Sequence, residues 1–245
     1  MTPVREFTYE PSVRTAYCCA QKLMGTRLEI ILTDIEKRAA ELLCEQILGE
    51  VIAADSLLNR FDPSSELSRL NSALKSSDLA PISPELARWI KLAEGYKRKT
   101  GGLFDVKYSG EYDFGGMAKG AMLKSISELL RGRGVNDALI NFGGSSIYGL
   151  GHHPFGDSWS IDVPDPFGTG NLCTVNLRDS GLSVSGNTPG YSAHIVNPSN
   201  GERISSRRIV VVQSPDPLDA EVLSTTLMVA HATTAFPDSE IKVYE

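Results

Sequence analysis

Residues 113–120, DFGGMAKG, are the first candidate for a ligand site, because two glycines and a lysine stand at the entrance of an expected helix. Glycines let a backbone approach a ligand closely, and the free amides of a helix N-terminus, together with Lys119, suit a phosphate. A glycine-rich turn with a solvent-exposed lysine explains the same residues, and spacing alone favours this simpler interpretation. The GxGxxG and GKS/T patterns are both missing, which excludes a dinucleotide fingerprint and a Walker loop.

The start of the last expected helix carries a cluster of acids and hydroxyls, namely Asp216, Asp219, Glu221, Ser224 and Thr225. Glu221 and Thr225 are four residues apart and therefore lie on one helix face. A set of oxygen ligands suits Mg²⁺, which also takes phosphate oxygens of a substrate. Acids in a first helical turn also stabilise the helix through its dipole, and spacing alone favours that explanation.

His194 lies in a polar turn, YSAHIVNPSNG, that follows a short β run. A histidine there is either a structural residue or a general base, and its position alone favours the structural role. The other histidines are weaker candidates, since residues 152–153 lie in a loop without a third ligand nearby and His231 falls near a helix end. The run GLSVS at 181–185 lacks the second glycine of a nucleophile elbow, so we exclude an α/β-hydrolase site.

Composition narrows the classes of function. The 245 residues carry a net charge of -6, with 41% hydrophobic and 22% charged residues, which is typical of a globular protein. This acidic balance argues against binding along nucleic acid, whose phosphates require a basic surplus. The chain has no apolar run near the roughly 20 residues of a membrane span, and its N-terminus lacks the apolar core of a signal peptide. With four cysteines and no CxxC pair, we expect a cytoplasmic protein, or an exported one if the given N-terminus is trimmed.

Hydrophobic periodicity predicts the helices. Thr33 and Glu36 have capping-box spacing ahead of a long amphipathic helix that reaches Leu58. Further helices are expected after the Asp-Pro turn at 62–63, from Ser83 to the glycines at 101–102, at 119–133 and at 218–232.

The remaining chain favours β-strands separated by Gly, Asn and Pro. Strands are expected for MGTRLEIIL at 24–32 and for the runs ALINF, SIYGL, WSIDV, CTVNL, GLSVS, AHIV, RIVVVQ and EIKVY. Helices and strands do not alternate regularly, so we predict an α+β fold with a mixed, mostly antiparallel sheet. The sequence has no linker or repeat, and we expect a single domain over residues 1–245.

Six segments, in this order along the chain, resemble the ApbE-like flavin transferases, also called FAD:protein FMN transferases. They are MGTRLEI (24–30), FDPSSELSRLN (61–71), TGGLFDV (100–106), DFGGMAKGAMLKSISELLRGRGVNDALINFGGS (113–145), SGN with AHIVNPSNGE (185–202) and AEVLSTTL (220–227). The segment at 113–145, with its glycine turn, lysine, helix and returning GG strand, is the most specific. The resemblance implies an ApbE-like, T-fold-like architecture in which packed helices cover the sheet.

The resemblance also implies an activity. Members of this family, many of them exported lipoproteins of bacteria, bind FAD with Mg²⁺, cleave its pyrophosphate and transfer FMN to a Thr or Ser hydroxyl of a target protein. Some members instead hydrolyse FAD to FMN and AMP. For this chain the resemblance implies FAD as substrate, Mg²⁺ as cofactor and an acceptor protein with a Thr/Ser flavinylation motif as partner.

The matching motifs imply roles for individual residues. His194 would be the base that takes the proton of the acceptor hydroxyl. The contacts to FAD would come from Met24, Phe61, Leu103, Phe104, Asp105, Asp113, Lys119 and Ile195, with Lys119 facing the phosphates. The metal ligands would be the Gly116 carbonyl and the side chains of Glu221, Ser224 and Thr225.

This chain differs from the family pattern at several positions, which include Lys124 and Asn197 and a short SG turn near Ser185. Glu221 stands where aspartate is usual, and the segment between Asp105 and Asp113 is much shorter than in typical members. We therefore expect a more open flavin site. An FAD pyrophosphatase, a non-catalytic FAD-binding protein and an interaction protein that keeps only the fold are the alternatives.

Overall fold

The computed structural model describes residues 5–76, 80–190, 194–230 and 236–245. These residues form ten strands and five helices. The strands are β1 (Arg5–Glu10), β2 (Thr15–Leu23), β3 (Thr26–Leu32), β4 (Ala138–Phe142), β5 (Ser146–Leu150), β6 (Trp159–Pro164), β7 (Asn171–Leu177), β8 (Ser180–Gly186), β9 (Ile209–Ser214) and β10 (Glu240–Tyr244). The helices are α1 (Lys37–Leu58), α2 (Glu66–Ser76), α3 (Pro84–Lys99), α4 (Ala118–Gly132) and α5 (Pro217–Val229).

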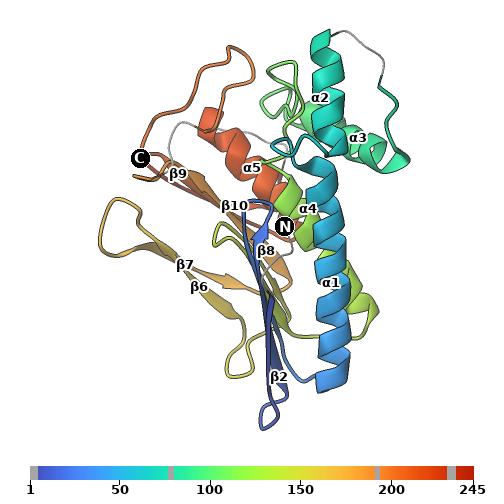
Figure 1. Cartoon of the computed structure of the whole chain (residues 1–245). Helices are drawn as coiled ribbons and strands as arrows, with labels where there is room; N and C mark the ends of the chain where they lie inside the picture. The colour runs from blue at the N-terminus through green and yellow to red at the C-terminus, as the bar shows by residue number, and fades with distance from the viewer. Residues whose placement is uncertain (1–4, 77–79, 191–193, 231–235) are drawn as a thin grey trace.

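Eight strands form one sheet in the order β1-β2-β3-β4-β5-β8-β9-β10, and β6 pairs with β7 in a separate two-stranded sheet. Every strand pair in the described residues is antiparallel. The helices cover one face of the large sheet and the β6–β7 hairpin lies on the opposite side (Figure 1). The predicted α+β fold with a mostly antiparallel sheet is confirmed.

Side chains that alternate in direction along β3 and β4 give the large sheet an apolar surface on each face. Leu28 and Ile30 stand opposite Phe142 and Ile140 in the register, and all four side chains are buried in the larger core beneath the helices. Residues of opposite parity face the other way, since side chains alternate across a strand. Ile31, for example, packs against the smaller core under the hairpin, which includes Trp159, Leu177 and Val211.

Helix α5 is buried between α4 and the sheet, where it packs against β8 and β9. Asp216 caps its N-terminus by accepting a hydrogen bond from the Leu218 amide at 2.9 Å. The helix packs closely on β8: a Cβ at Gly181 would lie 2.6 Å from the Cα of Pro217. The helix therefore holds its polar residues at fixed positions inside the molecule.

Most predicted elements are present, and one predicted cap is wrong. Helix α3 begins at Ser83, whose hydroxyl accepts a hydrogen bond from the Leu86 amide at 3.1 Å. The capping box at Thr33 does not form: α1 begins after Glu36, which makes no side-chain cap. Thr33 instead donates from its hydroxyl to the Asp137 carbonyl at 3.3 Å, so it joins the end of β3 to the segment before β4.

Three further boundaries differ from the sequence prediction. The strands β1 and β2 were not predicted at all. The predicted strand AHIV is wrong for residues 194–196, where only an isolated bridge joins Val196 to Arg203. Helix α5 ends at Val229 because Ala230 has an extended backbone, while residues 231–232 lie outside the described chain.

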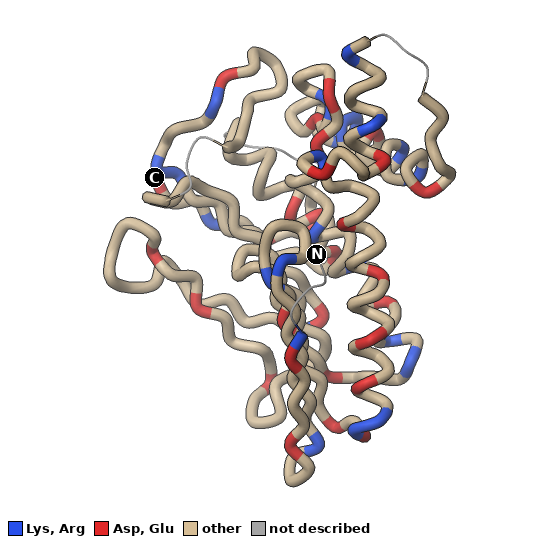
Figure 2. Tube along the Cα trace, viewed as in Figure 1, with Lys and Arg blue, Asp and Glu red and all other residues tan. Residues whose placement is uncertain are grey.

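Acidic and basic residues are interspersed along the chain trace (Figure 2). No helix in the described residues is long and apolar enough to cross a membrane.

Candidate functional site

The turn before α4 is held by Asp113. Its amide donates to the Val106 carbonyl at 2.8 Å, and its carboxylate accepts from the Gly115 amide at 2.9 Å and forms an ion pair with Arg60 Nε at 3.3 Å. Helix α4 has no acidic residue in its first turn and no side-chain cap at Met117. Its amide N–H groups and positive dipole end therefore face this turn without a counter-charge from α4 itself.

Helices α4 and α5 run antiparallel, and this brings residues that are about 100 positions apart in sequence into one cluster. A Cβ at Gly116 would lie 3.6 Å from the Thr225 hydroxyl, and a Cβ at Gly120 would lie 2.9 Å from Glu221 Oε2. One turn further, Lys124 pairs with Asp216. Gly116 and Gly120 thus allow α4 to approach the polar face of α5 closely.

Lys119 and Glu221 form the central contact of this cluster. Lys119 Nζ donates to Glu221 Oε1 at 2.6 Å, and the two side chains are 20% and 4% exposed. The second carboxylate oxygen, Oε2, is buried and has no hydrogen-bond donor among the described residues. A buried carboxylate oxygen without a donor is costly, and it marks a place where a cation or a donor can bind.

A group of hydroxyls lies one turn further along α5. Ser224 Oγ is 2.9 Å from Ser183 Oγ and 2.8 Å from Ser185 Oγ, and it donates to the Glu221 carbonyl at 3.0 Å. Ser185 Oγ is also 3.5 Å from the Thr225 hydroxyl. Ser224 is therefore tied into the protein, while Thr225 faces the Gly116 turn.

His194 and Lys119 interact electrostatically, so the histidine lies at this cluster. Burial is the main cause that lowers the pKa of His194, and the positive charge of Lys119 lowers it further. A lowered pKa keeps the imidazole neutral and able to accept a proton at neutral pH. The next residue, Ile195, is buried in the core.

The predicted nucleotide contacts are spread around the turn before α4. The Phe104 ring is buried, and a Cβ at Gly116 would lie 3.2 Å from its Cε2. Asp105 is paired with Lys97 at 2.6 Å, and Leu103 lies half-buried just before Phe104. Phe61 is 81% exposed with the Arg60 guanidinium over its ring, and the Arg60–Asp113 pair connects that segment to the turn.

Met24 lies in the turn between β2 and β3, away from the α4–α5 contact in sequence. Its backbone has a φ of 46° and its side chain packs against the larger core. The Met24 backbone also hydrogen-bonds to the carboxylate of Asp55 on α1, whose pKa is raised by burial.

The two other acids of the predicted oxygen cluster bind elsewhere. Asp216 pairs with Lys124, and Asp219 accepts from the Tyr96 hydroxyl at 2.6 Å and from Lys99 at 2.9 Å. Burial and Asp219 raise the pKa of Tyr96 well above its usual value. The acid in contact with Lys119 is therefore Glu221, and no group of three His, Cys, Asp or Glu side chains in the described chain could hold a metal ion.

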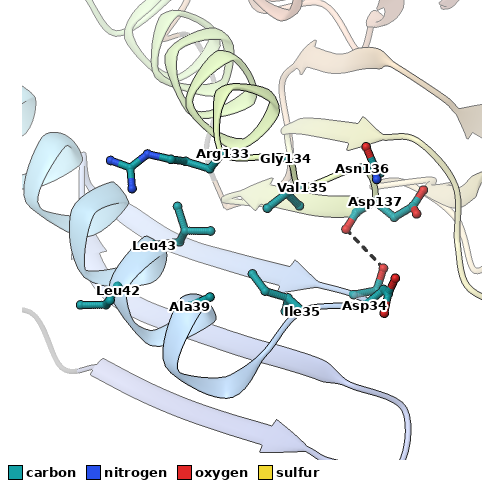
Figure 3. A pocket seen from close by; sticks show the side chains of 11 residues that line it. Asp34, Ile35, Ala39, Leu42, Leu43, Arg133, Gly134, Val135, Asn136 and Asp137 are labelled. Atoms are coloured by element: carbon teal, nitrogen blue, oxygen red, sulfur yellow. Dashed lines mark hydrogen bonds between the residues drawn. The ribbon is translucent and has the colours of Figure 1, made fainter.

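A cavity of about 290 Å³ lies at the opposite end of α4, between residues 133–137 and the start of α1 (Figure 3). Its walls combine polar and apolar groups, and none of the predicted site residues lines it. Its charged groups bind protein partners: Asp34 pairs with Arg14 at 3.0 Å, and Arg133 donates to Gln46 at 2.9 Å. The cluster around Lys119, rather than this cavity, is the candidate site.

Comparison with known proteins identifies the family of this chain. The sequence model of the ApbE family matches residues 24–112 and 108–238. The chain belongs to the ApbE family. Both ends of the α4–α5 contact lie within the matched residues.

Curated relatives match about half of the chain. The FAD:protein FMN transferase of Rhodobacter capsulatus is 31% identical over 128 residues, which are 49% of this chain and 24% of that protein. The FAD:protein FMN transferase of Klebsiella pneumoniae (strain 342) is 32% identical over 127 residues, 48% of this chain and 38% of that protein. The matched stretches thus span well under half the length of these relatives.

Solved structures of ApbE proteins share the fold. The flavin transferase ApbE from Vibrio cholerae superposes with a TM-score of 0.73 at 18% identity, covering 99% of this chain and 97% of that one. The ApbE protein of Thermotoga maritima gives a TM-score of 0.72 at 18% identity, covering 95% and 88%. At these identities the likeness shows the fold alone.

Sequence reasoning missed some polar groups of the candidate site. Ser183 and Ser185 lie at alternate positions of β8 and face α5 together. Two serines at alternate positions of the expected strand GLSVS were an available signal. The pairing of Tyr96 and Lys99 with Asp219 had no local signal, because α3 and α5 are more than 100 residues apart.

Proposed function

We propose that this protein is an FAD:protein FMN transferase that uses Mg²⁺ and a Thr or Ser hydroxyl of an acceptor protein. The supporting observation is the Lys119–Glu221 pair, with its carboxylate oxygen that lacks a donor, at the N-terminus of α4. An amide-rich helix end with a lysine suits the pyrophosphate of FAD, and an adjacent carboxylate suits a divalent cation.

The residues that are present fit a magnesium ion. Glu221 Oε2 is a buried oxygen without a donor, and Thr225 adds a hydroxyl beside the Gly116 turn. Mg²⁺ prefers such hard oxygen ligands and completes its shell with water and phosphate oxygens. Held there, the ion would neutralise charge on the phosphates during transfer. Ser224 supports the site indirectly, since its hydroxyl is bonded to two serines and to the Glu221 carbonyl.

The chain's own residues would divide the remaining work. The α4 amides and Lys119 bind and orient the pyrophosphate, and the Phe104 and Asp113 turn holds the nucleotide. The acceptor hydroxyl oxygen forms a bond to the phosphorus of the FMN half, the phosphoanhydride bond breaks, and AMP leaves with the bridging oxygen. His194 accepts the hydroxyl proton, which its lowered pKa permits at neutral pH.

The test is an incubation of the purified chain with FAD, Mg²⁺ and a protein domain carrying a Thr/Ser flavinylation motif. We expect acceptor-linked FMN, seen as protein fluorescence in a denaturing gel and as FMN-phosphoester mass, together with one AMP per FMN transferred. His194→Gln should reduce the rate at least about 100-fold, the usual contribution of a general base. His152→Gln, which changes an exposed loop histidine, should leave the rate unchanged.

Two other outcomes would overturn this proposal in favour of the alternatives. Release of FMN and AMP at the same rate with and without acceptor would make the protein an FAD pyrophosphatase. Stoichiometric binding of FAD that stays intact, with Mg²⁺ and acceptor present, would make it a binding protein.

A further inference from the structure

The position of Lys119 is unfavourable for α4 by itself. It is the second residue of the helix, where the positive end of the dipole repels a cation, and the first turn contains no acid. The compensation comes from Glu221 on α5, which receives the Lys119 hydrogen bond at 2.6 Å. One carboxylate thus balances both the lysine and the helix end.

The surrounding acids have cationic partners of their own. Asp216 pairs with Lys124, Asp219 with Lys99, and Asp113 with Arg60. Glu221 differs from them because it is almost completely buried and because one of its oxygens has no donor among the described residues. A divalent cation at this site would therefore compete with Lys119 for Glu221, while a pyrophosphate would compete with Glu221 for Lys119.

The two partners differ in their freedom to move. Glu221 is enclosed by α4, since a Cβ at Gly120 would lie 2.9 Å from both its Cβ and its Oε2. Lys119 keeps one fifth of its side chain exposed and has a long flexible stem. We therefore expect Lys119, rather than Glu221, to move when the pair opens.

We propose that Lys119 occupies Glu221 as an internal cation in the ligand-free protein, and that a divalent cation taking its place releases Lys119 toward the pyrophosphate of FAD. The two ligands then bind cooperatively, because each one frees the group that the other needs. This inference rests on the proposed function only in that it assigns the metal to Glu221 and the pyrophosphate to Lys119.

The direct test is Mn²⁺ binding to the whole chain without FAD, measured by the loss of the free-ion EPR signal. Lys119→Gln removes the internal cation, and we expect it to bind Mn²⁺ about tenfold more tightly than wild type. Lys124→Gln is the matched control, because it removes the same charge from the same helix but pairs with Asp216. It should stay within about twofold of wild type, as should Lys119→Arg, which retains the cation.

A Lys119→Gln protein that is folded by circular dichroism and binds Mn²⁺ no more tightly than wild type would overturn the inference. An equal gain in Lys124→Gln would also overturn it, because the effect would then be one of overall charge. Loss of Mn²⁺ binding in the double variant Lys119→Gln/Glu221→Gln is expected, and its persistence would place the metal elsewhere.

A second readout follows from reciprocity between linked sites. FAD affinity, measured by flavin fluorescence with Mg²⁺ or with EDTA, should rise with metal in wild type by a larger factor than in Lys119→Gln. Equal factors in the two proteins would contradict the coupling. These binding measurements do not depend on FMN transfer. If the metal and FAD bind cooperatively but no FMN is transferred, only the proposed function is refuted. If FMN is transferred but the metal and FAD bind independently, only this inference is refuted.

Discussion

Among individual residues, His194 has the environment that best matches its expected chemical role. Burial and the Lys119 charge both lower its pKa, so the imidazole is neutral over a wider pH range than an exposed histidine. A general base must be unprotonated, so in the proposed role the lowered pKa would extend activity toward acid pH. The effects of burial and of the Lys119 charge can be separated by experiment, because replacing Lys119 removes the charge and leaves His194 buried.

We predict that the His194 imidazole titrates below about 6.5, the ordinary histidine value, in the FAD-free protein. In Lys119→Gln the midpoint should rise, because the nearby positive charge is gone, but it should stay below 6.5 since burial remains. The measurement is an NMR titration of the imidazole carbon-bound protons, with the His194 signal assigned by its loss in His194→Gln. In Lys124→Gln the midpoint should not change, and a midpoint above 6.5 in wild type would contradict the prediction.

Residue pairs across the site could not be predicted from spacing. The sequence indicated Lys119 and Glu221 as separate candidates for a phosphate and a metal, and their direct contact depends on two helices that are joined only by tertiary packing. The same is true of Ser185 and Ser224, which meet across β8 and α5. Sequence motifs therefore identified which residues could bind a ligand, but not which residues contact one another in the fold.

At the level of elements, the site depends on the close approach of α4 and α5. Gly120 permits it, since a Cβ there would lie 2.8 Å from the Pro217 carbonyl oxygen and 2.9 Å from Glu221 Cβ. Both atoms are fixed by the α5 backbone, so a larger residue must push the helices apart. Gly132, at the other end of α4, has nothing within 4 Å of its Cβ position.

We predict that Gly120→Ala lowers the free energy of unfolding by about 1–3 kcal/mol, as overpacking does. It should also weaken Mn²⁺ binding by the folded protein, because Glu221 is displaced. Gly132→Ala, in the same helix, should be neutral or stabilise by up to about 1 kcal/mol, because alanine favours a helix over glycine. Urea unfolding and Mn²⁺ titration measure the two effects, and equal behaviour of the two variants would refute this account of the helix contact.

The elements were predictable where local signals agree with tertiary packing. Ser83 followed by Pro84 correctly predicted the start of α3. The strand pattern of residues 26–32 and 138–142 correctly predicted β3 and β4, whose side chains alternate between the two faces of the sheet. The strand β1 was missed although Phe7 and Tyr9 alternate with polar residues and pack against the larger core. The capping box failed because Thr33 bonds across the sheet to Asp137, a long-range contact that local spacing does not contain.

At the scale of the whole molecule, the large sheet separates two hydrophobic cores, and the candidate site lies on the same side of the sheet as the larger one. The larger core lies under the helices and includes Trp89, whose ring meets Phe114 edge-on with centroids 5.9 Å apart. Phe114 directly precedes the glycines of the α4 turn. The smaller core lies under the β6–β7 hairpin and includes Trp159, which is 3% exposed and donates to the Leu150 carbonyl at 2.9 Å.

We predict that Trp159→Leu and Trp89→Leu both destabilise the protein, by about 2–4 kcal/mol, because each leaves a cavity in a packed core. Only Trp89→Leu should also weaken FAD binding by the folded protein, because it loosens the Phe114 turn. Trp159→Leu should bind FAD within about twofold of wild type, since its core lies on the far face of the sheet.

The comparison requires FAD titration by flavin fluorescence at a temperature where both variants are fully folded, and urea unfolding for their stabilities. Both substitutions replace a buried tryptophan with leucine, and Trp159→Leu also removes the hydrogen bond to the Leu150 carbonyl. A loss of FAD affinity confined to Trp89→Leu would therefore reflect the face of the sheet on which each tryptophan lies, and not the size of the stability loss. Equal loss of FAD affinity in both would show that the hairpin face contributes to the site as much as the helical face does. The fold would then support the flavin through the sheet as a whole rather than through the α3–α4 turn.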